Sequence, residues 1–317
     1  MTVSSNPLAA LSDALADQVA QAAPRVAAIQ LRHGRHLTAT LWRGDLALAS
    51  DQSLARRDRF PVTLPDGRET EAEVVGRDDG SNLVLLRLDT ATTLDTPAAG
   101  IARTGALALA VGARRDGAPS ACLGVVNQVG PAWHSQAGGR IDAYIKIDLG
   151  MAPSEEGGPV LDPGGGVVGI STFGGERQGL GGQVIVIPHA TVERVVAQLV
   201  ESGHVARGWI GAALQPIAVP DLDEDLPARG FMIMSVVDGG PAQAAGLNPG
   251  DIIVTAGRQP VGRLHGLGGH IAGRIGQPLE LGIVRPLNAP GERVETVILT
   301  IAERPSAERP SAERPSE

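Results

Sequence analysis

The stretch Ile145–Thr172 reads IKIDLGMAPSEEGGPVLDPGGGVVGIST and decides how the rest of the chain is interpreted. Apolar residues at both ends predict β-strands, and the Gly-rich run after Asp162 predicts the tight turn that leads into the last strand. Between them, Gly157 and Gly158 indicate backbone in an unusual conformation, or in close approach to another group. From composition alone, an ordinary β-turn stays open as the alternative.

Length and composition describe an acidic chain of moderate size. The 317 residues predict about two domains, and 43% hydrophobic residues suffice for sizeable cores. Aromatic residues make up only 2%, so those cores must be built from aliphatic side chains. The net charge of −8 argues against a nucleic-acid partner. The single cysteine, Cys122, excludes an internal disulfide framework.

The N-terminal sequence MTVSSNPLAALSDALADQVAQ has no basic segment followed by a continuous apolar run, so it predicts no secretion signal. No stretch of the chain approaches the roughly 18 apolar residues of a membrane span. From these two observations we expect a cytoplasmic protein without membrane contact.

The chain divides into five segments. Residues 1–24 predict a helix, capped by Asn6 or Ser12, that packs on its own chain or on a neighbouring subunit. Residues 25–187 carry two sets of six short strands, as a double β-barrel requires. Residues 188–207 predict a connecting helix ended by Gly203. Residues 208–303 form a second domain, and the AERPS repeats of residues 304–317 predict a disordered tail.

The segment Asp148–Asp162 resembles the nucleophile loop of the HtrA family of chymotrypsin-fold serine proteases. The residues that match the family pattern are Asp148, Pro153, Gly157, Gly158, Pro159 and Asp162. The resemblance implies a mainly β fold, with a chymotrypsin-like double β-barrel followed by an α+β PDZ domain. Glu156 stands at the position of the family's serine, and Ser154 replaces a glycine two residues earlier.

The other two triad positions fall in motifs that also resemble the family. In Leu46–Leu54, Gln52 takes the place of the histidine, and in Val75–Arg87, Asn82 takes the place of the aspartate. Gln52 cannot accept a proton near pH 7, and the charge of Glu156 would oppose an oxyanion in the loop Ser154, Glu155, Glu156. We therefore expect no catalytic residues and no enzyme activity, that is, a pseudoprotease of the trypsin-like family.

Other functions stay open. One of Ser50, Ser53, Ser81 and Ser154 would serve as a displaced nucleophile if the chain were an active serine endopeptidase with a rearranged site. A third hypothesis is that the chain is a structural subunit that joins an active paralogue. A metal site at Asp51, Asp148, Glu155 and Glu156, or at His33 and His36, is disfavoured because solvated loops are far more common. We expect no metal and no cofactor.

The second domain resembles a PDZ domain of the circularly permuted bacterial type, most clearly in the run from Pro241 through Gly246-Leu247 to Gly250-Asp251. The resemblance implies a polypeptide-binding scaffold in bacterial protein quality control, with polypeptide C-termini or unfolded segments as partners. It leaves open a homo-oligomer such as a trimer, or a mixed oligomer. The implied peptide-binding residues are Trp209, Ile210, Gly211, Ala212, Ala213, Leu214, Leu267 and Ile271.

Overall fold

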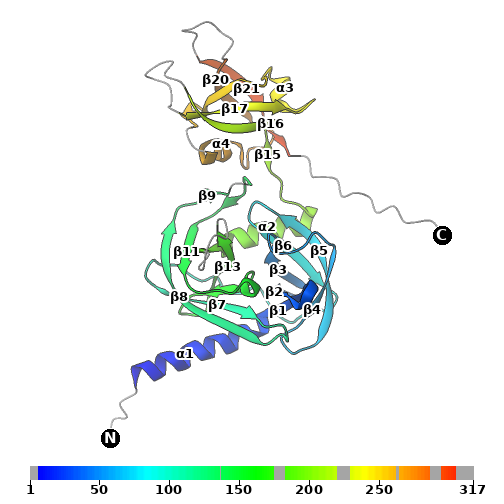
Figure 1. Ribbon diagram of the computed structural model, residues 1–317, viewed down its shortest axis with the longest axis vertical. Coiled ribbons are helices and arrows are strands. Elements are labelled where there is room, and N and C mark those ends of the chain that lie inside the picture. Colours follow the sequence, from blue (N-terminus) through cyan, green and yellow to red (C-terminus); the bar gives the residue numbers. More distant parts are fainter. Residues whose placement is uncertain are drawn as a thin grey trace, which may run out of the picture. The chain divides into compact units, whose positions relative to one another are not determined.

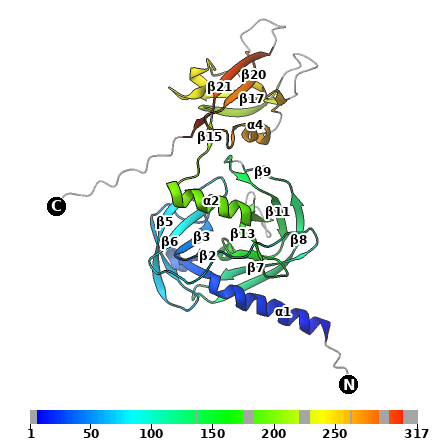
Figure 2. The ribbon, with the colours of Figure 1, turned by 180° about the vertical axis from the view of Figure 1, so that it is seen from behind.

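The computed structural model describes residues 6–135, 137–174, 183–219, 229–261, 264–285 and 294–304. The chain divides into two compact units, Met1–Val205 and Ala206–Glu317, which are drawn in Figures 1 and 2. The disorder expected for residues 304–317 concerns residues outside the described part, apart from Arg304, whose N–H donates to the Arg207 carbonyl.

The first unit begins with helix α1, Pro7–Ala22. Asn6 caps it, since its side-chain oxygen accepts a hydrogen bond of 3.1 Å from the N–H of Leu8. The helix packs on its own chain from its middle onward, whereas Leu8 near its start is 76% exposed. Leu15 is half-buried, the side chain of Gln18 donates to the Pro163 carbonyl, and Ala22 is buried.

Twelve of the strands form two closed antiparallel barrels, as the sequence predicted. The first closes in the order β1-β2-β3-β6-β5-β4 and the second in the order β11-β14-β13-β12-β7-β8. The first barrel consists of β1 Val26–Gln30, β2 His36–Arg43, β3 Leu46–Ser50, β4 Arg59–Thr63, β5 Glu69–Asp78 and β6 Leu83–Leu88. The second consists of β7 Leu107–Ala113, β8 Pro119–Gly130, β11 Tyr144–Asp148, β12 Pro159–Leu161, β13 Val167–Gly174 and β14 Gln183–Pro188.

Aliphatic side chains fill both barrels and the space between them. Strands such as β6, whose residues are buried at five of six positions, supply the barrel interior and also the interface between the barrels. Helix α2, His189–Ser202, adds Val192, Val195 and Leu199 to the same inter-barrel core. It ends as expected at Gly203, whose φ of 75° is the left-handed conformation that glycine adopts without strain.

The described residues of the second unit form a six-stranded antiparallel sheet, in which β19 pairs with β18, a two-stranded sheet of β15 and β22, and two helices. The strand order of the larger sheet is β16-β17-β18-β20-β21, so β16 lies at one edge. The elements are β15 Gly208–Trp209, β16 Ala212–Ala218, β17 Arg229–Val236, α3 Pro241–Ala244, β18 Ile252–Ala256, β19 Gln259–Pro260, α4 Leu264–Ile271, β20 Pro278–Val284, β21 Glu295–Thr300 and β22 Ala302–Glu303. No helix in the described residues is long and apolar enough to cross a membrane.

The predicted special backbone at Gly157 and Gly158 is confirmed. Gly157 has a φ of 92°, and a Cβ on it would lie 2.5 Å from the carbonyl oxygen of Thr38. A Cβ on Gly158 would lie 2.1 Å from the carbonyl oxygen of Val111. The loop is thus pressed against backbone of both barrels, and only glycine leaves room for that contact.

Gly158→Ala should destabilise the first unit strongly, because the added methyl group meets rigid backbone. We expect a loss of about 3 kcal/mol in the free energy of unfolding, at the upper end of the cost of overpacking. The matched control is Gly150→Ala, since a Cβ at Gly150 has nothing within 4 Å. Urea unfolding followed by circular dichroism measures both variants, and equal stabilities would contradict the described packing.

Candidate functional site

The three positions that the family triad would occupy lie together between the barrels. Gln52 follows β3, Asn82 precedes β6, and Glu156 follows the 3-10 turn Pro153–Glu155 (η3). The Nε2 of Gln52 donates a hydrogen bond of 2.5 Å to Oε1 of Glu156. Asn82 is linked to the same carboxylate through Ser50 and Thr172. The fold therefore assembles the site that the sequence motifs predict, with different side chains in it.

Glu156 is the centre of this site and its side chain is completely buried. Its Oε1 accepts hydrogen bonds from the hydroxyls of Ser50 and Thr172, both at 2.9 Å, and from the Phe173 N–H at 3.2 Å. Its Oε2 accepts a short hydrogen bond from the hydroxyl of Ser53. Donors from both barrels thus offset the cost of burying a carboxylate.

Asn82 positions the site residues Gln52 and Ser50, which come from the first barrel. It adopts a φ of 57°, which asparagine tolerates better than most residues. Its Oδ1 accepts a 2.7 Å hydrogen bond from the N–H of Gln52, and its Nδ2 donates to Ser50 at 3.0 Å. Because Ser50 in turn donates to Glu156, a chain of aligned hydrogen bonds runs from Asn82 to the carboxylate.

Two acidic residues near the site point to other partners. Asp51 is 3% exposed and pairs with Arg77 at 2.7 Å and with Arg56 at 2.9 Å. Glu155 turns away from Glu156 and accepts hydrogen bonds from the hydroxyl of Ser120 at 2.7 Å and from the thiol of Cys122 at 3.3 Å. In the described part of the chain no cluster of His, Cys, Asp and Glu is arranged to hold a metal ion.

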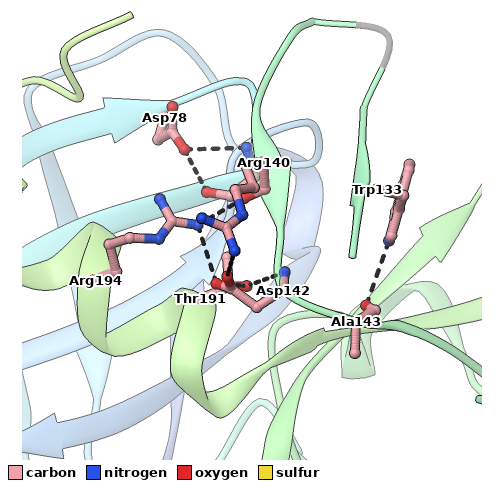
Figure 3. Close-up of polar contacts among 8 residues, drawn as sticks. Asp78, Trp133, Arg140, Asp142, Ala143, Thr191 and Arg194 are labelled. Atoms are coloured by element: carbon pink, nitrogen blue, oxygen red, sulfur yellow. Dashed lines mark hydrogen bonds and ion pairs between the residues drawn. The ribbon is translucent and has the colours of Figure 1, made fainter. Parts of the chain in front are cut away.

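Two contacts stabilise the loop that carries Asn82. Asp78, labelled in Figure 3, accepts hydrogen bonds from the N–H and the hydroxyl of Ser81 at 3.1 and 2.6 Å. Gly139, from the hairpin of β9 (Trp133–His134) and β10 (Arg140–Ile141), lies so close to Gly80 that a Cβ would come within 2.3 Å of the Gly80 carbonyl carbon.

Asp142, just after that hairpin, joins it to helix α2. It accepts hydrogen bonds from Thr191 at 2.8 Å and from Arg194 at 3.2 Å, and it pairs with Arg140 at 3.4 Å (Figure 3). The hairpin is therefore held at both ends, by the Asn82 loop and by the helix.

A cavity of about 220 Å³ opens beside Ser53 and Ser154. Ser154 is fixed there, because its carbonyl oxygen accepts a 2.8 Å hydrogen bond from Thr38. The cavity is lined by Leu31, Arg35, His36, Leu37, Ser53, Pro153 and Ser154. The sequence named His36 only as a disfavoured metal ligand, and the structure places it on the wall of this cavity.

In the second unit, strand β16 and helix α4 contribute to one apolar cluster. Ala212 and Leu214 on β16 and Ile271 on α4 are half-buried and pack on the same apolar cluster, which also contains the buried Ile210 and Leu267. The edge strand β16 pairs with β17 on one side only. Of the other predicted peptide-binding residues, Ala213 on β16 is exposed and Trp209 on β15 pairs with Ala302.

The loop before β16 is held by two backbone hydrogen bonds. Gly211 has a φ of 76°, and the carbonyl oxygens of Ile210 and Gly211 accept hydrogen bonds from Ala242 and Val237, both at 2.8 Å. No hydrogen bond within the described residues uses the N–H of Ile210 or Gly211. Gly208 anchors the loop, since a Cβ there would lie 2.1 Å from the carbonyl oxygen of Ile271.

Residues 37–170 match the trypsin-like peptidase domain family, and residues 232–285 match the PDZ domain family. The two matches cover the barrels and the sheet of the second unit in that order. This chain is a homologue of the HtrA-type serine proteases.

Solved structures support the homology over both units. "HtrA-type protease AlgW with decapeptide" superposes with a TM-score of 0.72 at 25% identity, covering 92% of this chain and 99% of that one. "HtrA-type protease AlgW with tripeptide" gives a TM-score of 0.70 at 27% identity, covering 92% and 98%.

Curated proteins of similar sequence carry names that agree with this homology. A protein of Brucella suis biovar 1 (strain 1330), named "Probable periplasmic serine endoprotease DegP-like", is 31% identical over 212 residues, 64% of this chain and 40% of its own length. A protein of the same name from Hahella chejuensis (strain KCTC 2396) is 30% identical over 246 residues, 75% of this chain and 51% of its own length. The HtrA homologue thus spans about half the length of these relatives, or less.

These relatives contradict two expectations from the sequence. The expectation that the chain is not an enzyme is wrong, because its relatives are named serine endoproteases. The expectation of a cytoplasmic location is also wrong, because the relatives are named periplasmic.

Several site residues escaped the sequence analysis. Thr172 and Phe173 reach Glu156 because β13 pairs with β12 directly after the nucleophile loop, and no motif marks them. Ser53 did have a signal, since it lies next to Gln52 in the first motif, but only the tertiary structure shows that its hydroxyl reaches Glu156.

The thiol of Cys122 should react slowly with alkylating reagents. Partial burial and the neighbouring carboxylate of Glu155 raise its pKa from 9.0 to about 11, so at pH 8 its thiolate population falls about a hundredfold. We expect iodoacetamide to modify it correspondingly slowly, and Glu155→Gln to speed the reaction in part, because burial remains. Ser120→Ala, which keeps the charge, is the control, and an unchanged rate in Glu155→Gln would contradict the contact.

Proposed function

We propose that this HtrA homologue binds the C-termini of polypeptides through its PDZ domain. The observation that carries the proposal is the pair of unused N–H groups at Ile210 and Gly211, which precede an edge strand with a free side. Buried N–H groups in folded proteins almost always have a partner, so two adjacent unused donors point to a ligand that supplies an acceptor.

A peptide C-terminus fits this arrangement. An extended peptide can add to the free edge of β16 through main-chain hydrogen bonds, and its terminal carboxylate can then accept from the two N–H groups. The half-buried side chains of Ala212, Leu214 and Ile271 would receive an apolar last residue such as Val, Leu or Phe. We expect micromolar affinity, about −8 kcal/mol, because ordering the Gly-rich helix α4 opposes binding.

Calorimetric titration with a peptide ending in an apolar residue tests carboxylate capture. The free peptide should bind at least about tenfold more tightly than its C-terminally amidated twin, because the amide removes the charge that the loop N–H groups stabilise. Ile271→Arg should abolish binding, whereas Ile298→Arg, at a side chain 64% exposed on β21, should not. Equal binding of the free and amidated peptides would sink the proposal.

A second candidate function is peptide-bond hydrolysis by a rearranged site, as the names of the relatives favour. The specific observation is that Ser53 donates to the Glu156 carboxylate and lines the cavity between the barrels. In such a site, Oγ of Ser53 would attack the carbonyl carbon while its proton passes to Oε2 of Glu156. That proton would return to the leaving amine as the C–N bond breaks, and water would then release the acyl group from Ser53.

A carboxylate is a weaker base than an imidazole near pH 7, so turnover by Ser53 and Glu156 should be slow. We expect a fluorophosphonate probe to label Ser53, and both labelling and casein cleavage to be lost in Ser53→Ala. Ser235→Ala, in the second unit, serves as the matched control. Peptide mapping of the labelled protein identifies the modified serine. Labelling that persists in Ser53→Ala, or the absence of labelling in the parent chain, would refute this mechanism.

The setting of the protein is part of the proposal. The relatives are named periplasmic, which supports a periplasmic location for this chain. Its partners would then be polypeptide C-termini or unfolded segments in that compartment. Assembly into a homo-oligomer such as a trimer, or into a mixed oligomer with another family member, stays a prediction.

A further inference from the structure

A turn of basic residues lies beside the cavity and takes no part in the functions above. It connects β1 to β2 and reads Arg32-His33-Gly34-Arg35-His36, with exposed side chains at Arg32, His33 and Arg35. A second turn brings Arg115 to the same place, because a Cβ on Gly34 would lie 3.1 Å from Nη1 of Arg115. The Arg115 carbonyl accepts a 2.9 Å hydrogen bond from Gln30 at the end of β1, which fixes the second turn.

This basic cluster, defined as Arg32, Arg35, His36 and Arg115, is not neutralised within the described part of the chain. None of the three arginines forms an ion pair there, although most other arginines of the first unit do. The acidic residue of the second turn, Asp116, pairs instead with Arg114 at 3.1 Å. Unpaired positive charge gathered in a chain of net charge −8 requires an explanation.

The cavity connects this cluster to the site between the barrels. Arg35 and His36 line one part of it, and the hydroxyl-bearing residues Ser53 and Ser154 line another. Ser53 donates to the buried carboxylate of Glu156, so the cavity borders the site itself. At about 220 Å³ it is smaller than the roughly 300–1,000 Å³ of pockets for whole small molecules, and it suits a single side chain.

We infer that the cavity binds the carboxylate side chain of an Asp or Glu in a polypeptide lying along the cleft, so that the protein selects acidic segments. Guanidinium groups bind carboxylates with paired, charge-assisted hydrogen bonds, and serine hydroxyls supply further donors. Leu31, Leu37 and Pro153 accept the methylene groups of the same side chain. The inference rests on the proposed polypeptide-binding function and adds a second contact, in the first unit.

Fluorescence anisotropy on the full chain tests this selection. Two N-terminally labelled, C-terminally amidated peptides are compared, one with three Glu residues in an Ala/Val background and one with Gln in their place. Amidation keeps carboxylate capture by the PDZ domain out of the measurement. In low salt we expect the Glu peptide to bind about tenfold more tightly than the Gln peptide, although the chain as a whole is negatively charged. The difference in affinity between the two peptides should shrink as salt is added.

The double variant Arg35→Glu/Arg115→Glu should remove or reverse the preference for the Glu peptide. Arg103→Glu, at an exposed arginine of the second barrel, introduces the same type of charge change and should keep it. A preference that survives the double variant, or equal binding of the two peptides by the parent chain, would overturn the inference.

Binding of an apolar peptide with a free C-terminus and no acidic residue is measured on the same preparations. Its retention in the double variant shows that the second unit is folded, and thermal unfolding by circular dichroism checks the barrels. If this apolar peptide binds equally well with a free and with an amidated C-terminus, only the PDZ proposal fails. The two failures are therefore distinguishable.

Discussion

The burial of the Glu156 carboxylate between the two barrels is the interaction on which the cleft depends. A buried carboxylate is tolerated only when hydrogen-bond donors surround it, and here they come from both sides: Ser50, Gln52 and Ser53 from the first barrel, Thr172 and Phe173 from the second. The position that holds a serine in the family pattern has become the acceptor at which both halves of the unit converge. Displacing either barrel would remove the donors that it supplies and leave the buried charge only partly satisfied.

The glycine pair that follows makes this convergence possible. Gly157 and Gly158 let the loop pass within contact distance of the Thr38 and Val111 carbonyls, one in each barrel, which lowers Glu156 fully into the interface. The backbone of the family loop is therefore kept even though its central side chain differs. The backbone of this loop sets the fold, and its side chains set the chemistry. Similarity of fold to the relatives therefore does not fix the mechanism, which depends on the side chains.

The two units differ in how far their polar groups are satisfied. In the cleft, hydroxyls and amides donate in sequence toward one carboxylate, which makes that network rigid. In the second unit, no hydrogen bond within the described residues uses the N–H groups of Ile210 and Gly211, and β16 pairs there with β17 alone. The donors of the cleft are thus occupied within the first unit, whereas these two N–H groups have no acceptor in the described part of the second.

Local pattern was sufficient for much of the fold. Alternating apolar residues predicted two sets of six strands, and helical spacing after Pro188 with an end at Gly203 predicted α2. The motif frames also located Gln52, Asn82 and Glu156. These features depend on residues close in sequence, whose spacing and turn chemistry can be read directly. The inferences about activity and location were wrong because each was drawn from an absence, and an absence of expected residues is weak evidence for either property.

The sequence by itself determined the order of the two domains, the special backbone at Gly157-Gly158 and the identity of the residues at the three triad positions. Only the tertiary structure decided that Ser53 reaches the Glu156 carboxylate, that Thr172 completes its shell, and that Arg115 joins the turn at Gly34. Those contacts join residues 103, 16 and about 80 positions apart. Closure of the barrels brings such residues together, and side-chain contacts across that distance leave no periodic signal in a single sequence.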